Sequence, residues 1–460
     1  MKKLSVLMVI CVLMITTVLS ACSSSGNNNS GNSGNTPQTP ATSGNGGGDP
    51  APQPDPNAPS DLSGEVVAWM DHPNKVMELV PEFNKKYPNI KVTVENPGED
   101  YHDKIITALA TGTGGPDIGQ IRSAHYWRFK ALDGLEDLLQ EPYNAGRFKD
   151  DYTETSWKLM TSLDNERLYG LTINVPPMMM FYRADIFEEN GFPSDPAELG
   201  EFVKDPDNFF DMAAALRAKG HYMFRSLLEV TNVASDGSDY YDHDLNYLRN
   251  TDVFVNAIDY AKRANQLDIV FNSSSEEMNQ GLNTGKFVTR FIALKSGIDN
   301  LTANSPNHIG NWRATSLPFG YVTGSSMSGM SILSQSKNKE AAWAFIEFLT
   351  TAPEANTFFM KELGFVSPYI PARELPVVKD ATVELLGGQN AVEFAYTFYD
   401  KLNYPIGTPL VKDANDVWNS KIEEAVQKNQ DSRTVLQQIM EETEKKVSIE
   451  KDRLLQLIGK

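Results

Sequence analysis

Hydrophobic and polar positions repeat with two different periods along the chain after its first sixty residues. Short apolar runs rich in β-branched residues occupy 65–70, 90–94 and 117–121, and this pattern predicts strands. Between those runs, apolar residues at helical spacing occupy 75–86 and 101–111 and predict helices. Because strands and helices alternate at this interval, we expect parallel βαβ units, which means an α/β fold of open sheets with helices on both faces.

The middle and the end of the chain are predicted to be mainly helical. Residues 185–283 carry helical spacing interrupted by irregular loops, including 231–244. An amphipathic helix is expected at 338–350, and residues 416–447 fit two more helices. The length of 460 residues is enough for two or three lobes with hydrophobic cores of their own.

The first sixty residues differ in composition from everything that follows. Two lysines precede an apolar run that ends in Leu-Ser-Ala, so residues 1–21 have the build of a secretory signal peptide. An uncleaved membrane anchor is the alternative, although no flanking charge follows the run. Residues 22–60 consist of small, polar and proline residues without an aromatic side chain, which predicts a disordered linker.

The two cysteines carry a further prediction about the start of the mature chain. Cys11 lies inside the predicted signal and Cys22 directly follows it, so the mature chain cannot form an internal disulfide. The Leu-Ser-Ala-Cys ending resembles the bacterial lipobox. This resemblance implies that Cys22 carries a lipid, which tethers the protein to the outer face of the cytoplasmic membrane.

Charge and spacing exclude several classes of function. The formal net charge of −19 argues against nucleic acid and against anionic lipid as partners, since both need clustered basic residues. The six histidines are scattered without zinc-site spacing, so we expect no metal. The densest polar cluster, 239–244, matches no cation-binding loop and is interpreted as an exposed acidic loop.

No motif for catalysis or for a cofactor appears in the sequence. Residues 281–287 resemble a phosphate loop only superficially, because they are one residue short and place Phe287 where a hydroxyl should hold magnesium. Residues 324–329 miss the spacing of a nucleophile elbow. We therefore expect no catalytic residues and no cofactor. A secreted glycosidase remains the alternative from another class, because its paired carboxylates meet only in the fold.

Several stretches in order along the chain resemble the family 1 extracellular solute-binding proteins of ABC importers, the group that includes the maltose- and oligosaccharide-binding proteins. The matching stretches are VVAW at 66–69, FNKKYPNIKV at 83–92, YHDKIITALATG at 101–112, GPDI at 115–118, YGL at 169–171, MFYRADIF at 180–187, SKNKEAAWAFIEFL at 336–349 and GFVSP at 364–368. The chain departs from the family pattern at Arg183, where Asn is usual, and it lacks a Trp near 296–298.

The resemblance implies the type II periplasmic-binding-protein fold, with two lobes built on open, mostly parallel sheets and joined by crossing hinge segments. The expected lobes are 61–175 with 319–363 and 176–318 with 364–460. It also implies a monomer without enzyme activity that captures an oligosaccharide between the lobes and delivers it to the permease subunits of an ABC importer. A polyamine or a short peptide is the alternative ligand.

The candidate site residues come first from loops at the carboxyl ends of strands, where open α/β sheets present their ligands. The end of the run 65–70 supplies Trp69, and the loops after 65–70 and 117–121 supply Asp71, His72, Asn74, Arg122 and Tyr126. Sugar binding needs aromatic faces beside polar groups, and these loops contain both. For Asp71 and Asn74, capping of the next helix is the alternative role.

The remaining candidates follow from the resemblance. Asn174 stands at the first crossing, where the family has a ligand contact, and Arg225 belongs to the second lobe. Trp312 precedes the second crossing and is an aromatic candidate. Trp418 matches the region in which the family places a stacking aromatic residue, with ordinary core packing as an equal alternative.

Overall fold

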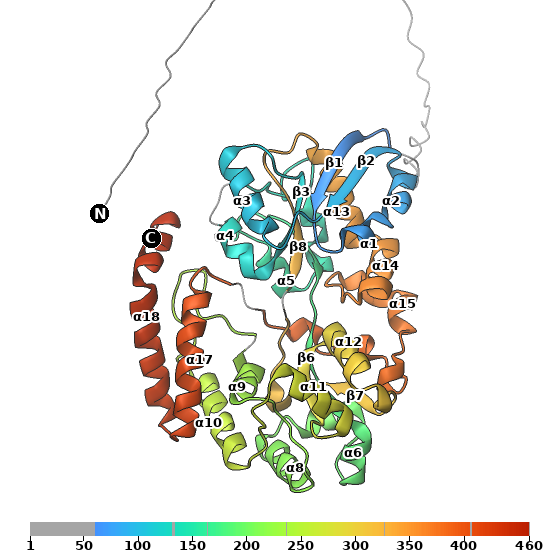
Figure 1. Cartoon of the computed structure of the whole chain (residues 1–460). Coiled ribbons are helices and arrows are strands. Elements are labelled where there is room, and N and C mark those ends of the chain that lie inside the picture. Colours follow the sequence, from blue (N-terminus) through green and yellow to red (C-terminus); the bar gives the residue numbers. More distant parts are fainter. Residues whose placement is uncertain are drawn as a thin grey trace, which may run out of the picture. The chain divides into compact units, whose positions relative to one another are not determined.

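The structure is a computed structural model that describes residues 60–130, 134–162, 164–235, 237–325, 327–404 and 407–459. The predicted signal peptide at 1–21, the linker up to residue 59 and Cys22 lie outside the described residues. The described chain forms two α/β lobes, each built around one sheet (Figure 1). No helix among the described residues combines the length and the hydropathy that a bilayer span requires.

The sheet of the first lobe has five strands in the order β2-β1-β3-β8-β4. Its strands are β1 (Ser63–Trp69), β2 (Asn89–Glu95), β3 (Ile118–Arg122), β4 (Leu171–Asn174) and β8 (Ser328–Ile332). β1 pairs in parallel with β2 and β3, whereas β8 runs antiparallel to β3 and β4. The predicted strands are therefore confirmed for this lobe, whereas its sheet is mixed, with two parallel and two antiparallel ladders.

Helices of the first lobe cover that sheet and match the predicted spacing, with one break. They are α1 (Pro73–Met77), α2 (Val80–Lys86), α3 (Tyr101–Thr111), α4 (Tyr126–Lys130), α5 (Glu154–Leu159), α13 (Lys339–Thr351) and α14 (Pro353–Leu363), with 3-10 turns η1 (Ser123–His125) and η2 (Ala145–Asp151). The single helix expected at 75–86 is two helices, and Pro81 stands in the first turn of the second one. A proline is favourable there because its missing N–H is not needed.

The sheet of the second lobe differs from the prediction of a mostly parallel sheet. It has three strands in the order β6-β5-β7, namely β6 (Thr289–Ala293), β5 (Met178–Arg183) and β7 (Trp312–Thr315). Both ladders are antiparallel, because the central strand β5 runs opposite to its two neighbours.

The remaining helices belong to the second lobe. They are α6 (Ala184–Glu189), α7 (Pro196–Phe202), α8 (Pro206–Ala218), α9 (Leu227–Ser235), α10 (Asp252–Gln266), α11 (Ser275–Thr284), α12 (Leu294–Asn304), α15 (Pro376–Lys379), α16 (Ala391–Tyr396), α17 (Val411–Gln427) and α18 (Ser432–Leu457), with 3-10 turns η3 (Pro306–His308), η4 (Pro318–Gly320), η5 (Ile370–Glu374), η6 (Glu384–Leu386) and η7 (Tyr399–Lys401). The long helices α17 and α18 lie side by side, and α10 packs against α9 and α17 (Figure 1).

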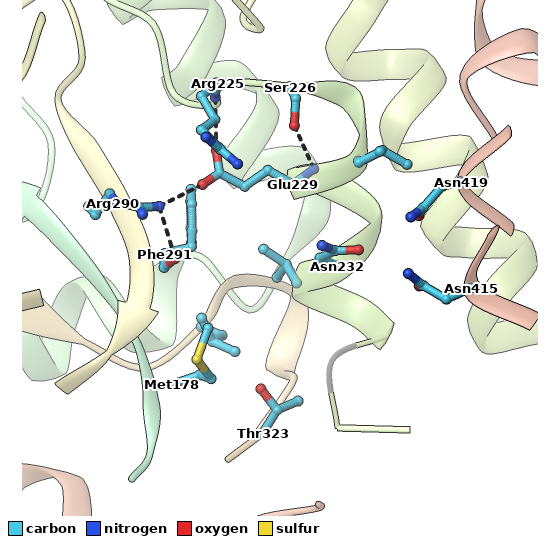
Figure 2. Close-up of a pocket in the computed structure, with 13 residues that line it drawn as sticks. Met178, Arg225, Ser226, Glu229, Asn232, Arg290, Phe291, Thr323, Asn415 and Asn419 are labelled. Atoms are coloured by element: carbon cyan, nitrogen blue, oxygen red, sulfur yellow. Dashed lines mark hydrogen bonds and ion pairs between the residues drawn. The ribbon is translucent and has the colours of Figure 1, made fainter. Parts of the chain in front are cut away.

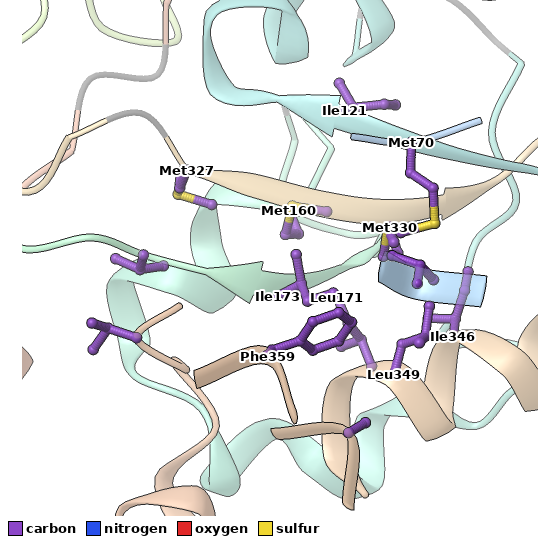
Figure 3. Close-up of a cluster of buried hydrophobic side chains, with 14 of the residues drawn as sticks. Met70, Ile121, Met160, Leu171, Ile173, Met327, Met330, Ile346, Leu349 and Phe359 are labelled. Carbon is purple, nitrogen blue, oxygen red and sulfur yellow. The ribbon is translucent and has the colours of Figure 1, made fainter. Parts of the chain in front are cut away.

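Two hydrophobic clusters hold the described chain together, and β5 separates them. Met179 and Phe181 belong to the first cluster, whereas Met180 and Tyr182 belong to the second. This division follows from the strand itself, because successive side chains point to opposite faces. Figure 3 shows part of the first cluster, where side chains of β3, β4 and β8 meet those of α13 and α14.

The acidic cluster at 239–244 is less exposed than the sequence indicated. Asp239, Tyr240 and Tyr241 are buried, and only Asp244 of this stretch is exposed. The Asp242 carboxylate accepts the backbone N–H groups of Asp244 and Asn246 and so closes a local turn. The prediction of an exposed loop is wrong for its first half, because the tyrosine rings pack into the second hydrophobic cluster.

Candidate functional site

A cavity of about 320 Å³ lies in the second lobe beside the segments that lead into and out of its sheet. Its lining residues come from the start of β5, the loop before α9, α9 itself, β6, the segment between β7 and β8, and α17. They are Met178, Arg225, Ser226, Leu228, Glu229, Asn232, Val233, Arg290, Phe291, Leu317, Thr323, Asn415 and Asn419 (Figure 2). This mixture of a few apolar side chains with many hydrogen-bonding groups is typical of a site for a polar organic ligand.

A buried ion pair forms one side of the cavity. Glu229 Oε1 lies 3.1 Å from Arg290 Nη1, and the two side chains are only 10% and 18% exposed. Burial raises the pKa of Glu229, and the positive charge of Arg290 opposes that rise. Burial also lowers the pKa of Arg290, with Glu229 opposing the change. For both groups the free energy lost on desolvation therefore exceeds the free energy gained from the ion pair. The pair is costly for folding.

The ion pair is tied to the backbone at the start of α9. Ser226 Oγ accepts the backbone N–H of Glu229 at 3.1 Å, and Glu229 Oε2 accepts the backbone N–H of Arg225 at 2.8 Å. The first bond satisfies a donor that the helix start leaves free, and the second satisfies the backbone N–H of the residue two positions before the helix. The carboxylate is thus fixed by the same residues that begin the helix.

Three asparagines face the cavity from two neighbouring helices. Asn232 belongs to α9, whereas Asn415 and Asn419 stand one turn apart on α17. Tyr240 donates its hydroxyl to Asn415 Oδ1 at 3.0 Å, so the Nδ2 group of this amide is left to donate elsewhere. The guanidinium of Arg249 lies 3.6 Å from the centre of the Tyr240 ring and holds that ring in place.

The apolar part of the lining centres on Phe291. One face of this ring stacks on Phe224, with ring centres 4.8 Å apart and planes 12° from parallel. Thr323 adds a buried hydroxyl that has no hydrogen-bond partner among the described residues. A buried polar group without a partner costs free energy, so a ligand or a water that bonds this hydroxyl is favoured.

The structure brings two of the predicted residues together at the carboxyl ends of β1 and β3. Arg122 donates to both carboxylate oxygens of Asp71, at 2.7 and 3.1 Å. The backbone N–H of Asp71 donates to Gln120 at 2.7 Å, which fixes the loop after β1. The alternative of helix capping is wrong for Asp71 and Asn74, because His72 precedes α1 and no side-chain cap is formed.

A neutral histidine accepts a hydrogen bond from the backbone of Arg122 in the Asp71–Arg122 pair. The backbone N–H of Arg122 donates to His102 Nε2 at 3.2 Å, which requires that nitrogen to be unprotonated. Burial, followed by the neighbouring His125 ring, lowers the pKa of His102 to about 3. The ring therefore stays an acceptor at neutral pH.

Three of the predicted aromatic contacts are corrected by the structure. The side chains of Tyr126, Trp312 and Trp418 have no exposed surface. Tyr126 shares a hydrogen bond with Ser331, and Trp312 donates its indole N–H to Ser305 at 3.1 Å. Each ring fills a hydrophobic cluster. None of them can stack on a ligand in this conformation.

The other predicted residues differ in their burial and in their contacts. Trp69 is partly buried against the first cluster, while His72 and Asn74 are exposed. Asn174 Oδ1 accepts the backbone N–H of Val366 at 3.0 Å and so joins β4 to the segment that follows α14. Among the predicted residues in the described ranges, Arg225 is the one that lines the cavity.

Sequence reasoning missed most of the cavity. Glu229, Asn232, Arg290 and Phe291 were not predicted, because no motif distinguishes them from other polar or aromatic residues on helices and strands. One signal was present for α17. Asn415 and Asn419 are four residues apart, so they share a face beside the apolar stripe of that helix. Within the described residues, no group of three metal-ligating side chains comes together.

Comparison with known proteins agrees with this architecture. The sequence pattern of the family described as bacterial extracellular solute-binding protein matches residues 78–383. The arabinooligosaccharide-binding protein of Bacillus subtilis (strain 168) is 26% identical over 332 residues, which cover 64% of this chain and 70% of that protein. A protein of the same name from Halalkalibacterium halodurans is 23% identical over 363 residues, covering 74% of this chain and 79% of that protein.

Solved structures share the fold at lower identity. One described as extracellular solute-binding protein family 1 has a TM-score of 0.72 at 20% identity and covers 83% of this chain and 99% of its own. The sugar-binding protein MalE from Xanthomonas citri has a TM-score of 0.68 at 21% identity, with coverages of 86% and 98%. These likenesses establish the two-lobed fold.

Proposed function

The chain belongs to the bacterial extracellular solute-binding proteins, and we propose that it captures an oligosaccharide and delivers it to the permease of an ABC importer. The observation that carries the proposal is the cavity of the second lobe, which is lined by the ring of Phe291 and by the amides of Asn232, Asn415 and Asn419. Sugars present apolar ring faces and many hydroxyls, so they need both kinds of group. The two relatives named for arabinooligosaccharide binding support the same class of ligand.

The charges of the cavity favour a sugar over a polyamine, and binding over hydrolysis. A polyamine needs an excess of carboxylates, but the cavity has two guanidinium groups and one carboxylate among its described lining residues. A glycosidase places two carboxylates on either side of the bond that it cleaves. Glu229 is the single carboxylate in this lining, and it is engaged by Arg290, which favours binding over hydrolysis.

We propose that the first lobe supplies the opposite wall of the binding site. Its candidates are Trp69 and Arg122 at the carboxyl ends of β1 and β3, together with Asp71 and His72 in the loop after β1. The proposed lobes comprise 61–175 with 319–363 and 176–318 with 364–460, and the ligand is held when they close about the crossing segments. Closure of two domains around a ligand is a common binding transition of such proteins.

A thermal-shift screen of the purified protein tests the proposed function. We expect an oligosaccharide to raise the melting temperature and polyamines to leave it unchanged, because a ligand that binds only the folded state stabilises it by mass action. The Asn232→Ala variant should lose most of this shift, while Asn208→Ala on the exposed start of α8 should keep it. A polyamine or a peptide as the stabilising ligand would contradict the proposal.

We propose further that the protein is a monomer tethered to the membrane through lipidated Cys22, with residues 22–60 as the spacer. Cells that express the Cys22→Ser variant should release the protein into the medium without incorporating a palmitate analogue, since the mature chain has no other thiol. A Ser23→Ala variant is the control and should stay labelled. Continued labelling of the Cys22→Ser protein would refute the lipid anchor.

A further inference from the structure

We infer that the cavity selects carbohydrates that carry a carboxylate, such as oligosaccharides of uronic acids, and that Arg225 binds this carboxylate. The inference rests on the proposed function and makes it more specific. It starts from the balance of charge in the cavity. Arg225, Glu229 and Arg290 are the ionisable groups among its described lining residues, so one carboxylate stands against two guanidinium groups.

Both oxygens of the single carboxylate, Glu229, already accept hydrogen bonds. Glu229 Oε1 accepts from the side chain of Arg290 at 3.1 Å, while Oε2 accepts the backbone N–H of Arg225 at 2.8 Å. Arg290 is therefore matched by a full ion pair, whereas the Arg225 side chain gains only the more distant attraction of the same carboxylate. The cavity keeps an unmatched positive charge.

The guanidinium of Arg225 is left available for a ligand. It is half-buried and donates from Nη1 to Ser275 Oγ at 3.1 Å, and no carboxylate of the described residues lies within ion-pair distance. Other arginines of this acidic chain differ in this respect. Arg122, Arg183 and Arg217 each hold an aspartate at 2.6 to 2.7 Å. A guanidinium presents a planar fork of donors that matches a carboxylate in two parallel hydrogen bonds.

The two ends of the cavity suit two parts of one acidic sugar. Figure 2 shows Arg225, Glu229 and Arg290 gathered at one end, with Asn232, Asn415 and Asn419 on the side toward α17. Burial lowers the pKa of Arg290, and the charge of Arg225 adds to this lowering while Glu229 opposes it. An anion at the arginine end relieves that repulsion. The hydroxyls of the same ligand then face the amides.

Calorimetric titration with matched sugar pairs tests the inference. The probes are α-1,4-digalacturonate against α-1,4-galactobiose, and glucuronate-substituted xylo-oligosaccharides against linear ones. We expect tighter binding of the acidic member, with an affinity that falls as salt is added. Arg225→Gln should weaken binding of the acidic member by roughly 10- to 100-fold, the value of a charge-assisted hydrogen-bond pair, and leave the neutral member within about threefold. Arg453→Gln on α18 makes the same change in net charge away from the cavity and should have no effect.

Each remaining outcome would overturn the inference. Binding of neutral members in preference to acidic ones would overturn it and leave the proposed function in place. Acidic sugars that bind Arg225→Gln as tightly as the unaltered protein would overturn the role of Arg225. The absence of binding by every sugar in the panel would count against the proposed function as well.

Arg225→Lys keeps the positive charge but loses the planar fork of donors, so we expect it to bind the acidic sugar with an intermediate affinity.

Discussion

Replacing Trp418 with alanine should destabilise the folded protein by about 3–5 kcal/mol, the usual cost of removing a large aromatic ring from a core. Its side chain has no exposed surface and packs edge-on against Tyr240 and Phe254, with ring centres 6.3 and 5.6 Å away. The sequence alone allowed ligand stacking as an equal reading, under which affinity falls and the melting temperature of the free protein stays constant. Because the ring is buried, we expect the melting temperature of the free protein to fall instead.

Denaturant unfolding and ligand titration of the same variant distinguish these two roles. Asp416→Ala, which changes an exposed position two residues away on α17, is the control and should unfold within about 0.5 kcal/mol of the unaltered protein. A Trp418→Ala protein of unaltered stability that has lost its affinity would show that the ring contacts ligand after all.

The burial of Trp418 could have been predicted from the spacing of its own helix. Ala414, Val417, Ile422 and Ala425 recur at helical intervals on either side of it, so the ring stands in the middle of an apolar stripe. The resemblance to a family with stacking aromatics outweighed this local signal. Where a family analogy and the periodicity of the chain disagree about one side chain, the periodicity reports directly on packing.

The fold of the first lobe was predictable because each of its signals is local. The runs at 65–70, 90–94 and 117–121 became β1, β2 and β3, and 101–111 became α3 with unchanged bounds. The direction of β5 in the second lobe was not predictable in the same way. Strand pairing joins residues far apart in sequence, here Phe181 with Arg290 and Ala314, and no local pattern encodes which partner is parallel.

The candidate site was harder to predict than the fold for a related reason. The cavity joins Glu229, Arg290 and Asn419, which lie on two helices and a strand widely separated along the chain. Each of these residue types is ordinary at an exposed position, so only the fold shows that they converge. Arg225 was predicted, yet its significance comes from Glu229, whose carboxylate is already held by Arg290.

The Glu229–Arg290 pair should show opposite effects when it is broken and when it is replaced. Glu229→Leu leaves the guanidinium of Arg290 mostly buried without its carboxylate, and we expect a loss of about 3 kcal/mol in the free energy of unfolding. This value is at the low end of the usual cost, because the Arg290 side chain is 18% exposed and remains partly hydrated. The double variant Glu229→Leu with Arg290→Met removes both charges and should recover most of that loss.

The reason lies in the direction of the two pKa shifts. Burial raises the pKa of Glu229 and lowers that of Arg290, so each charged form is disfavoured by the fold even with its partner present. Because both side chains line the cavity, we expect the single and the double variant to lose affinity for the ligand as well. Urea unfolding of Glu229→Leu, Arg290→Met and the double variant forms a thermodynamic cycle. This cycle measures the coupling between the two charges. Additive losses in that cycle would show that the two side chains stabilise the lobe independently and would contradict the predicted coupling.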